Sequence, residues 1–133
     1  MSRTAAWCVL LGLLGGCAGE PVGIVQGDVF GGEGIQLTVR EVGADLEWDC
    51  AVGRIEEPFR PSDDGFFDLD GTRTSGIGGP IREDDPPRPE EARYRGRVSG
   101  SSMTLSVELP ARGLTLGPYR LRYGEEGVLR RCL

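Results

Sequence analysis

The sequence predicts an all-β fold, a small antiparallel meander barrel of about eight strands. After residue 34, apolar and polar residues alternate with the period of two that is typical of half-buried strands. Glycine-containing turn signals separate these stretches. No stretch after residue 16 has the 3.6-residue apolar period of an amphipathic helix. Closing the meander into a barrel would remove unpaired sheet edges, and a two-sheet β-sandwich is the alternative.

The first sixteen residues have the layout of a secretory signal peptide. Arg3 supplies positive charge, and residues 5–14 form an apolar stretch. A transmembrane helix would need about 20 such residues. The boundary, Leu14-Gly15-Gly16-Cys17, resembles the bacterial lipobox, in which two small residues precede a cysteine whose thiolate accepts a diacylglyceryl group. We therefore expect residues 1–16 to be removed and Cys17 to be lipidated; an ordinary secretory signal followed by an incidental cysteine is the alternative.

A lipid anchor predicts a location in the cell envelope, where several acyl chains would make membrane attachment stable. Ala18, rather than an aspartate, follows Cys17, and this resembles the pattern for forwarding to the outer membrane of a diderm bacterium. Residues 17–33 are predicted to be the lipidated cysteine and a flexible tether, because they are rich in glycine and lack sustained periodicity. Residues 22–30 could still hold a short strand. Residues 34–133 are predicted to form a single β domain.

The first elements of this domain are predicted from alternation. Residues 35–39 and 46–50 alternate on either side of a turn at residues 42–44, which predicts a half-buried hairpin. Further strands are predicted at residues 53–57, 66–69 and 72–77. The dipeptide Asp70-Gly71 separates the last two and is typical of tight hairpin turns.

The second half of the domain begins with a loop. Residues 81–91 combine three prolines with acidic residues, so they cannot pair continuously in a sheet. Beyond them the alternation predicts a second hairpin with its turn at Gly100-Ser101, then a strand ending at Tyr123. Residues 129–133 are predicted to be a final short strand carrying Cys132.

The cysteines predict one disulfide bond. Cys8 would leave with the signal peptide and Cys17 would carry lipid, so Cys50 and Cys132 remain as the only intramolecular pair. A closed meander pairs its first and last strands, which would bring Cys132 towards Cys50. The loss of chain entropy on closing this loop corresponds to about 4.5 kcal/mol as an upper estimate. Reactive thiol chemistry is the competing interpretation, but the chain contains no histidine to activate a thiolate.

Short motifs are spread over most of the mature chain: Trp48-Asp49-Cys50-Ala51-x-Gly53-x-Ile55, Gly65-x-Phe67, Gly71-Thr72, Gly78-Gly79-Pro80, Ala92-x-Tyr94-x-Gly96-x-Val98-x-Gly100-x-x-Met103-x-Leu105-x-Val107 and Cys132-Leu133. Together they resemble a group of small, uncharacterised exported bacterial proteins. The resemblance implies an all-β domain with one disulfide and transfers no activity. In that group a histidine often stands near the position of Val52, and its absence here removes any metal role that it could have.

Two groups of carboxylates are candidate chemical sites. The first comprises Asp63, Asp64, Asp68 and Asp70. It fails the calcium-loop pattern, because aligning Gly71 with the loop glycine puts apolar residues where the first and last acidic ligands belong. A hairpin turn and a solvated acidic surface are the favoured interpretation.

The second group comprises Asp45, Glu47 and Asp49, which would lie on one strand face at intervals of about 7 Å. This separation overlaps that of glycosidase carboxylates, but an outward face normally meets water or arginine. We therefore predict no enzyme activity, no cofactor and no metal.

An arginine stripe, made of Arg93, Arg95, Arg97, Arg120 and Arg122, raises the question of nucleic-acid binding. The net charge of −6, which becomes more negative when Arg3 is removed, would repel phosphate at long range. We expect these arginines instead to pair across strands with Glu108 and other acids.

The leading functional hypothesis is a non-catalytic envelope lipoprotein whose barrel binds a small apolar ligand or contacts an envelope protein. The aromatic residues expected to line a ligand cavity are Trp48, Tyr94, Tyr119 and Tyr123. The alternative is an inhibitor of a secreted hydrolase such as lysozyme, because some small disulfide-bonded β-barrel lipoproteins are such inhibitors. An acidic surface would steer a basic enzyme towards the domain.

Overall fold

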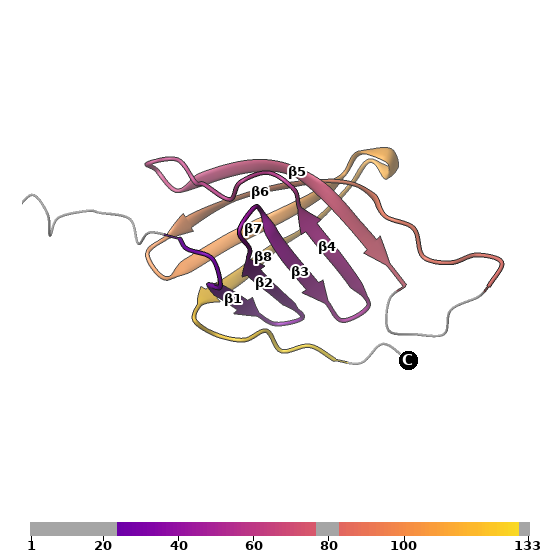
Figure 1. The fold of residues 1–133 in the computed structure, drawn as a ribbon, viewed down its shortest axis with the longest axis horizontal. Coiled ribbons are helices and arrows are strands. Elements are labelled where there is room, and N and C mark those ends of the chain that lie inside the picture. Colours follow the sequence, from indigo (N-terminus) through magenta and orange to yellow (C-terminus); the bar gives the residue numbers. More distant parts are fainter. Residues whose placement is uncertain (1–23, 77–82, 131–133) are drawn as a thin grey trace, which may run out of the picture.

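The computed structural model describes residues 24–76 and 83–130, which form a closed barrel of eight antiparallel strands joined in chain order (Figure 1). The predicted meander barrel is therefore confirmed, and the sandwich alternative is wrong. The strands are β1 (Val29–Gly32), β2 (Ile35–Val39), β3 (Ala44–Trp48), β4 (Ala51–Ile55), β5 (Phe66–Ser75), β6 (Glu90–Ser99), β7 (Ser102–Leu109) and β8 (Leu114–Tyr123), with a 3-10 turn, η1 (Pro110–Arg112), before β8.

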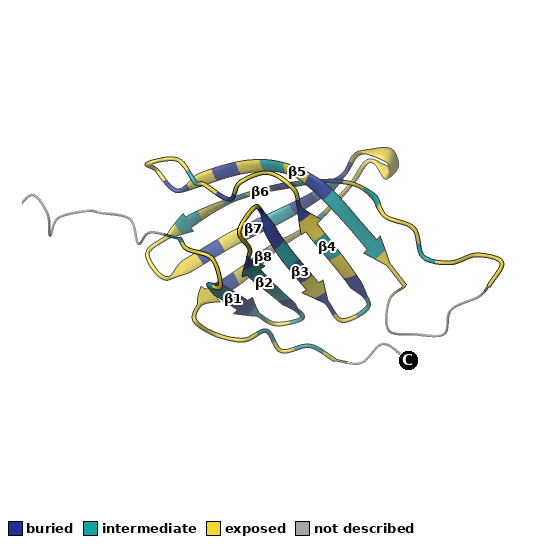
Figure 2. Cartoon of the chain, in the orientation of Figure 1, coloured by how far each residue is buried: buried dark blue, intermediate teal, exposed yellow. Residues whose placement is uncertain are grey.

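Alternation of buried and more exposed residues builds most of the core. On β2, for example, Ile35, Leu37 and Val39 are buried while Gln36 and Thr38 are only partly covered. Figure 2 shows buried segments interrupting exposed ones on several other strands, whereas β8 is exposed along most of its length and buries only Leu121. Inward residues from different strands form one continuous hydrophobic cluster in the barrel interior.

Strand β5 is longer than the sequence predicts. The structure carries one continuous strand through Asp70-Gly71, so the hairpin turn predicted there is wrong. Gly71 is required for a different reason: it faces inward, and a Cβ there would overlap the carbonyl of Arg54 on the neighbouring β4. The glycine therefore permits close approach of two strands rather than a turn.

Barrel closure uses residues that the sequence places in the tether. Strand β1 lies within the segment 17–33 and pairs with β8, with Phe30 opposite Tyr123 and Gly31 opposite Arg122. The ordered barrel therefore begins earlier than residue 34. Alternation in the sequence does not reveal this strand, because Phe30 is its buried hydrophobic residue and the residues that follow Phe30 in β1 are glycines.

The segment after β8 returns across the barrel surface as an extended strap, residues 124–130. Gly127 N donates to Gln36 Oε1 at 2.9 Å, and Val128 forms a parallel bridge with Glu33. Its backbone passes so close to β1 that a Cβ at Gly31 would overlap it. Residues 129–130 belong to no strand, although a strand is predicted at residues 129–133. Residues 131–133 lie outside the described part of the chain.

The predicted acidic loop is largely as expected. Residues 83–89 belong to no strand, although β6 begins at Glu90, inside the range predicted as loop. Within the described residues, no helix has the length and apolar character needed to cross a membrane.

Candidate functional site

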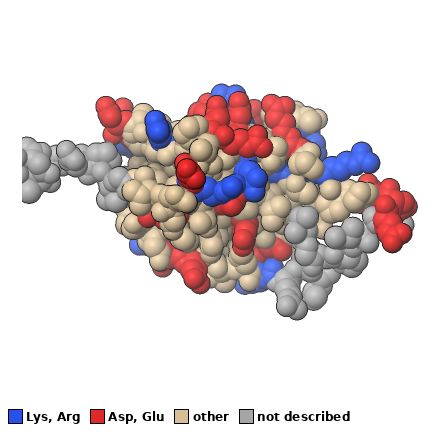
Figure 3. Space-filling model, in the orientation of Figure 1, with Lys and Arg blue, Asp and Glu red and all other residues tan. Residues whose placement is uncertain are grey.

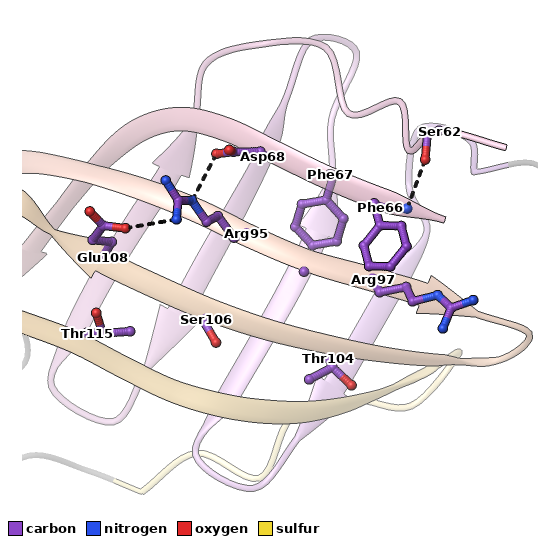
Figure 4. Close-up of a pocket in the computed structure, with 11 residues that line it drawn as sticks. Ser62, Phe66, Phe67, Asp68, Arg95, Arg97, Thr104, Ser106, Glu108 and Thr115 are labelled. Atoms are coloured by element: carbon purple, nitrogen blue, oxygen red, sulfur yellow. Dashed lines mark hydrogen bonds and ion pairs between the residues drawn. The ribbon is translucent and has the colours of Figure 1, made fainter. Parts of the chain in front are cut away.

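A groove of about 690 Å³ lies on the outer face of β5–β8 (Figure 4). Its lining consists mainly of outward side chains from successive strands, which the curvature of the barrel brings side by side. The lining residues are Ser62, Phe66, Phe67, Asp68, Arg95, Gly96, Arg97, Thr104, Ser106, Glu108 and Thr115.

One end of the groove is aromatic. Phe66 faces outward at the start of β5 and is 56% exposed, although its neighbour Phe67 is buried. The guanidinium carbon of Arg97 lies 4.9 Å from the centre of the Phe66 ring, so the two side chains stack. Arg97 Nε donates to the carbonyl of Asp64 at 3.1 Å, and this fixes the guanidinium beside the ring.

The other end is a network of charges that neutralise one another. Arg95 lies between Asp68 and Glu108, with nitrogen–oxygen distances of 3.4 Å to each (Figure 4). Arg93 Nε donates to the same Asp68 carboxylate at 2.6 Å. This hydrogen bond and the nearby arginine charges lower the pKa of Asp68, outweighing the opposing effect of desolvation. Asp68 is therefore held as a carboxylate.

Short hydroxyl side chains of β7 and β8 line the groove beside both ends, with Thr104 opposite Arg97, Ser106 opposite Arg95 and Thr115 opposite Glu108 (Figure 4). Thr104 stands opposite Arg97 on one side and Arg120 on the other. In the described part of the chain, neither of these arginines makes an ion pair. The groove thus has paired charges at one end and, at the other, the Arg97 guanidinium, which has no acidic partner among the described residues. Arg120 stands opposite Thr104, outside the groove lining.

The predicted pairing of the arginine stripe is accordingly confirmed for part of it. Arg93 and Arg95 pair with acids on neighbouring strands, including Glu108 for Arg95, and Arg122 approaches Glu125 at 3.8 Å. Arg97 and Arg120 do not follow the prediction, because no carboxylate stands opposite them: their cross-strand neighbours are Phe66 and Thr104.

The four aromatic residues predicted to line a cavity do not all lie together in the structure. Trp48 and Tyr119 meet edge to face at 6.4 Å between ring centres, and Tyr94 is fully buried with its hydroxyl donating to Thr72 O at 2.6 Å. Tyr123 instead packs against Phe30 and is 40% exposed.

The candidate carboxylates lie on the surface. Asp45 pairs with Arg40 and Arg54, at 3.4 and 3.3 Å, while Asp49 Oδ1 accepts the backbone N–H of Arg130. In the parts of the chain that the structure describes, no three His, Cys, Asp or Glu side chains are grouped so that they could hold a metal ion.

The predicted cysteine sites lie at the edges of what the structure describes. Cys17 and Cys132 are outside the described residues, and Cys50 lies in the turn between β3 and β4. The bond from Arg130 N to Asp49 Oδ1, 2.8 Å, places the C-terminal strap beside this turn. The Cys50–Cys132 disulfide therefore stays a prediction, with the strap leading towards its expected position.

Comparison with known proteins adds no family. No protein-family model, curated protein or solved structure matched the chain. Alternation in the sequence predicts the strands of the fold. It does not single out Phe66, the exposed aromatic residue of the groove. An available signal was its place beside Phe67, since two successive aromatic residues in an alternating strand must face opposite sides.

Proposed function

We propose that this chain is a lipid-anchored, non-catalytic binding protein of the cell envelope, and that the groove over β5–β8 holds an extended segment of an envelope protein. The exposed Phe66, stacked on an arginine that has no acidic partner in the described structure, carries the proposal. Aromatic residues and arginine are enriched at interface hot spots. Phe66 and Arg97 are both exposed, so both are accessible to a partner.

The charges favour an acidic segment as the occupant. Arg95 is already neutralised by Asp68 and Glu108, so the unmet positive charge of the groove lies at Arg97, with Arg120 beyond the lining on β8. A carboxylate on the partner could bind Arg97 through its terminal nitrogens, because its Nε is committed to Asp64 O. An apolar side chain next to that carboxylate would cover Phe66.

The same network argues for binding rather than acid catalysis. A general acid needs a carboxyl group whose pKa is raised, whereas the pKa of Asp68 is lowered by Arg93 and Arg95. Of the two carboxylates that line the groove, Asp68 therefore serves to hold Arg93 and Arg95 in place rather than to act as an acid.

Site-specific photo-crosslinking tests the proposal. The photoreactive analogue p-benzoylphenylalanine replaces Phe66 in one strain and Val52, which is 38% exposed on β4, in a control strain. We expect a discrete protein adduct at position 66 alone, and a synthetic peptide from its crosslinked segment should bind about tenfold more weakly to Phe66→Ala and to Arg97→Gln.

Equal adducts at positions 66 and 52, or peptide binding that is unchanged by Arg97→Gln, would overturn the groove as the partner site. A small ligand retained in native mass spectrometry, without a protein adduct at position 66, would replace the protein partner with a small apolar ligand.

Inhibition of a secreted hydrolase is the second candidate. The chain carries a net charge of −6, and Figure 3 shows carboxylates along the upper edge of the molecule, over β5. Such a surface attracts a basic enzyme such as lysozyme. Purified protein should then inhibit lysozyme in a manner that weakens as salt is added; activity unchanged at excess protein would exclude this candidate for lysozyme.

A further inference from the structure

A second polar site lies inside the barrel, separate from the outer groove. On β5, Arg73 follows the inward register of Phe67 and Gly71, so its side chain enters the barrel near the end of the strand. Its guanidinium carbon lies 4.7 Å from the centre of the Trp48 ring, which is 8% exposed. An inward arginine is unusual in this interior, where the fully and nearly fully buried side chains are hydrophobic.

Two hydrogen-bond donors at this place have no acceptor. Arg73 Nε and Trp48 Nε1 are both buried, and the described structure gives neither a hydrogen-bond partner. Buried donors are satisfied in nearly all native proteins, so each exception requires an explanation. Here both exceptions belong to two side chains in direct contact, which indicates one missing acceptor group rather than two unrelated defects.

Nearby groups are already committed elsewhere. Glu90 stands opposite Arg73 in the register, but its Oε1 accepts from Arg112 Nε at 3.0 Å and from Arg112 Nη2 at 2.9 Å. The Tyr94 hydroxyl donates to Thr72 O. Within the described residues, Arg73 forms no ion pair. Over residues 24–76 and 83–130, the positive charge that this arginine carries into the barrel is thus balanced by no carboxylate in an ion pair.

The chemistry of the two donors selects the ligand. A guanidinium and a neighbouring indole N–H both donate, and neither accepts. A planar carboxylate matches the guanidinium geometry and has a further lone pair for the indole. The rings of Trp48 and Tyr119, which meet edge to face, provide an apolar surface beside it. We propose that the Arg73 end of the barrel binds the carboxylate of a small aromatic or apolar organic acid.

Nuclear magnetic resonance tests this site directly in the full chain carrying Cys17→Ser. Benzoate is the probe, benzamide is its uncharged counterpart, and inorganic phosphate is the competing anion. We expect benzoate to shift the Trp48 indole N–H and the Arg73 Nε–H resonances downfield with one saturation curve, because both donors gain the same acceptor. Benzamide should leave them unchanged.

Variants separate the site from general charge. Arg73→Gln should weaken benzoate binding about 10- to 100-fold, the effect of losing a charge-assisted hydrogen bond. The matched control is Arg54→Gln, which removes an arginine on the exposed outer face of β4 and should keep the affinity. If Arg73→Gln does not fold, Trp48→Phe serves instead, and it should weaken binding while retaining an apolar ring.

Three results would contradict the proposed carboxylate site. Unchanged Trp48 and Arg73 resonances at saturating benzoate would overturn the site, and equal binding of phosphate and benzoate would overturn the assignment to a carboxylate. Loss of affinity in Arg54→Gln as large as in Arg73→Gln would show that net charge, rather than this site, determines binding.

Discussion

Replacing Tyr94 with phenylalanine removes one oxygen atom from the centre of the barrel and leaves the ring in place. The Tyr94 ring is fully buried, and its hydroxyl makes a 2.6 Å hydrogen bond to Thr72 O. Losing a buried hydrogen bond and leaving its acceptor without that donor costs about 1–2 kcal/mol. For a domain of this size, each kcal/mol lowers the melting temperature by about 4–8 °C.

The matched control is Tyr123→Phe. Tyr123 is 40% exposed and donates to Asp28 Oδ1 at 3.1 Å, where water can replace the bond. Its loss should change stability by less than about 0.5 kcal/mol. Urea denaturation of both variants in the Cys17→Ser background measures the difference. Equal effects of the two substitutions would refute the argument that burial determines the cost.

The same tyrosine predicts a loss of stability at high pH. Burial raises the pKa of Tyr94 well above its ordinary value, with the charge of Arg73 opposing the effect. The unfolded chain therefore loses its phenolic proton first, so this contribution to stability is complete below about pH 10 and is lost as the pH rises further. Tyr94→Phe should show a shallower decline above pH 10 than the unsubstituted protein.

Three further outcomes follow from the sequence and the fold. Cys17→Ser should move the protein from membranes to the soluble fraction on cell fractionation, and continued membrane association would contradict a lipid anchor at Cys17. Cys50→Ala and Cys132→Ala should each destabilise the domain by at most about 4.5 kcal/mol. The double variant should be no less stable than either single variant, because all of them remove the same disulfide bond. Two reactive thiols in the oxidised protein would contradict the pairing. Gly53→Ala should destabilise the barrel by about 1–3 kcal/mol in urea denaturation, because a Cβ there would overlap the Tyr94 hydroxyl and approach the Trp48 ring. An unchanged stability would show that these side chains can move apart.

Alternation was sufficient to predict most strands and the class of fold. It works on β7, where Met103, Leu105, Val107 and Leu109 are all buried, because one face of each strand meets a single core. It fails where glycine has two roles: Asp70-Gly71 has the composition of a turn, yet Gly71 is needed for close contact with β4. Only the neighbouring strand distinguishes these roles, and local sequence does not contain it.

The candidate site was less predictable for a related reason. The sequence predicts which arginines face outward, but pairing depends on cross-strand register, which puts Arg95 beside Asp68 and Arg97 beside Phe66. A shift of two residues would preserve the inward and outward faces and exchange these neighbours. Arg73 was missed because its inward position depends on the unbroken length of β5.

The short seam between β1 and β8 determines how the barrel responds to mechanical load. Only Phe30 and Gly31 of β1 have partners on β8, whereas the β5–β6 ladder runs from Phe66 to Arg73. If the chain is anchored through its N-terminus, a pull on the anchor is borne by β1 through both of its neighbours. These are β2, which Gly27 and Asp28 also contact through Val39, and the shorter seam with β8. The strap crosses β1 and binds β2 through Gln36, so it resists β1 being peeled away. Amide protons of the seam should therefore exchange faster than those of β5–β6, and faster still when the strap is cut.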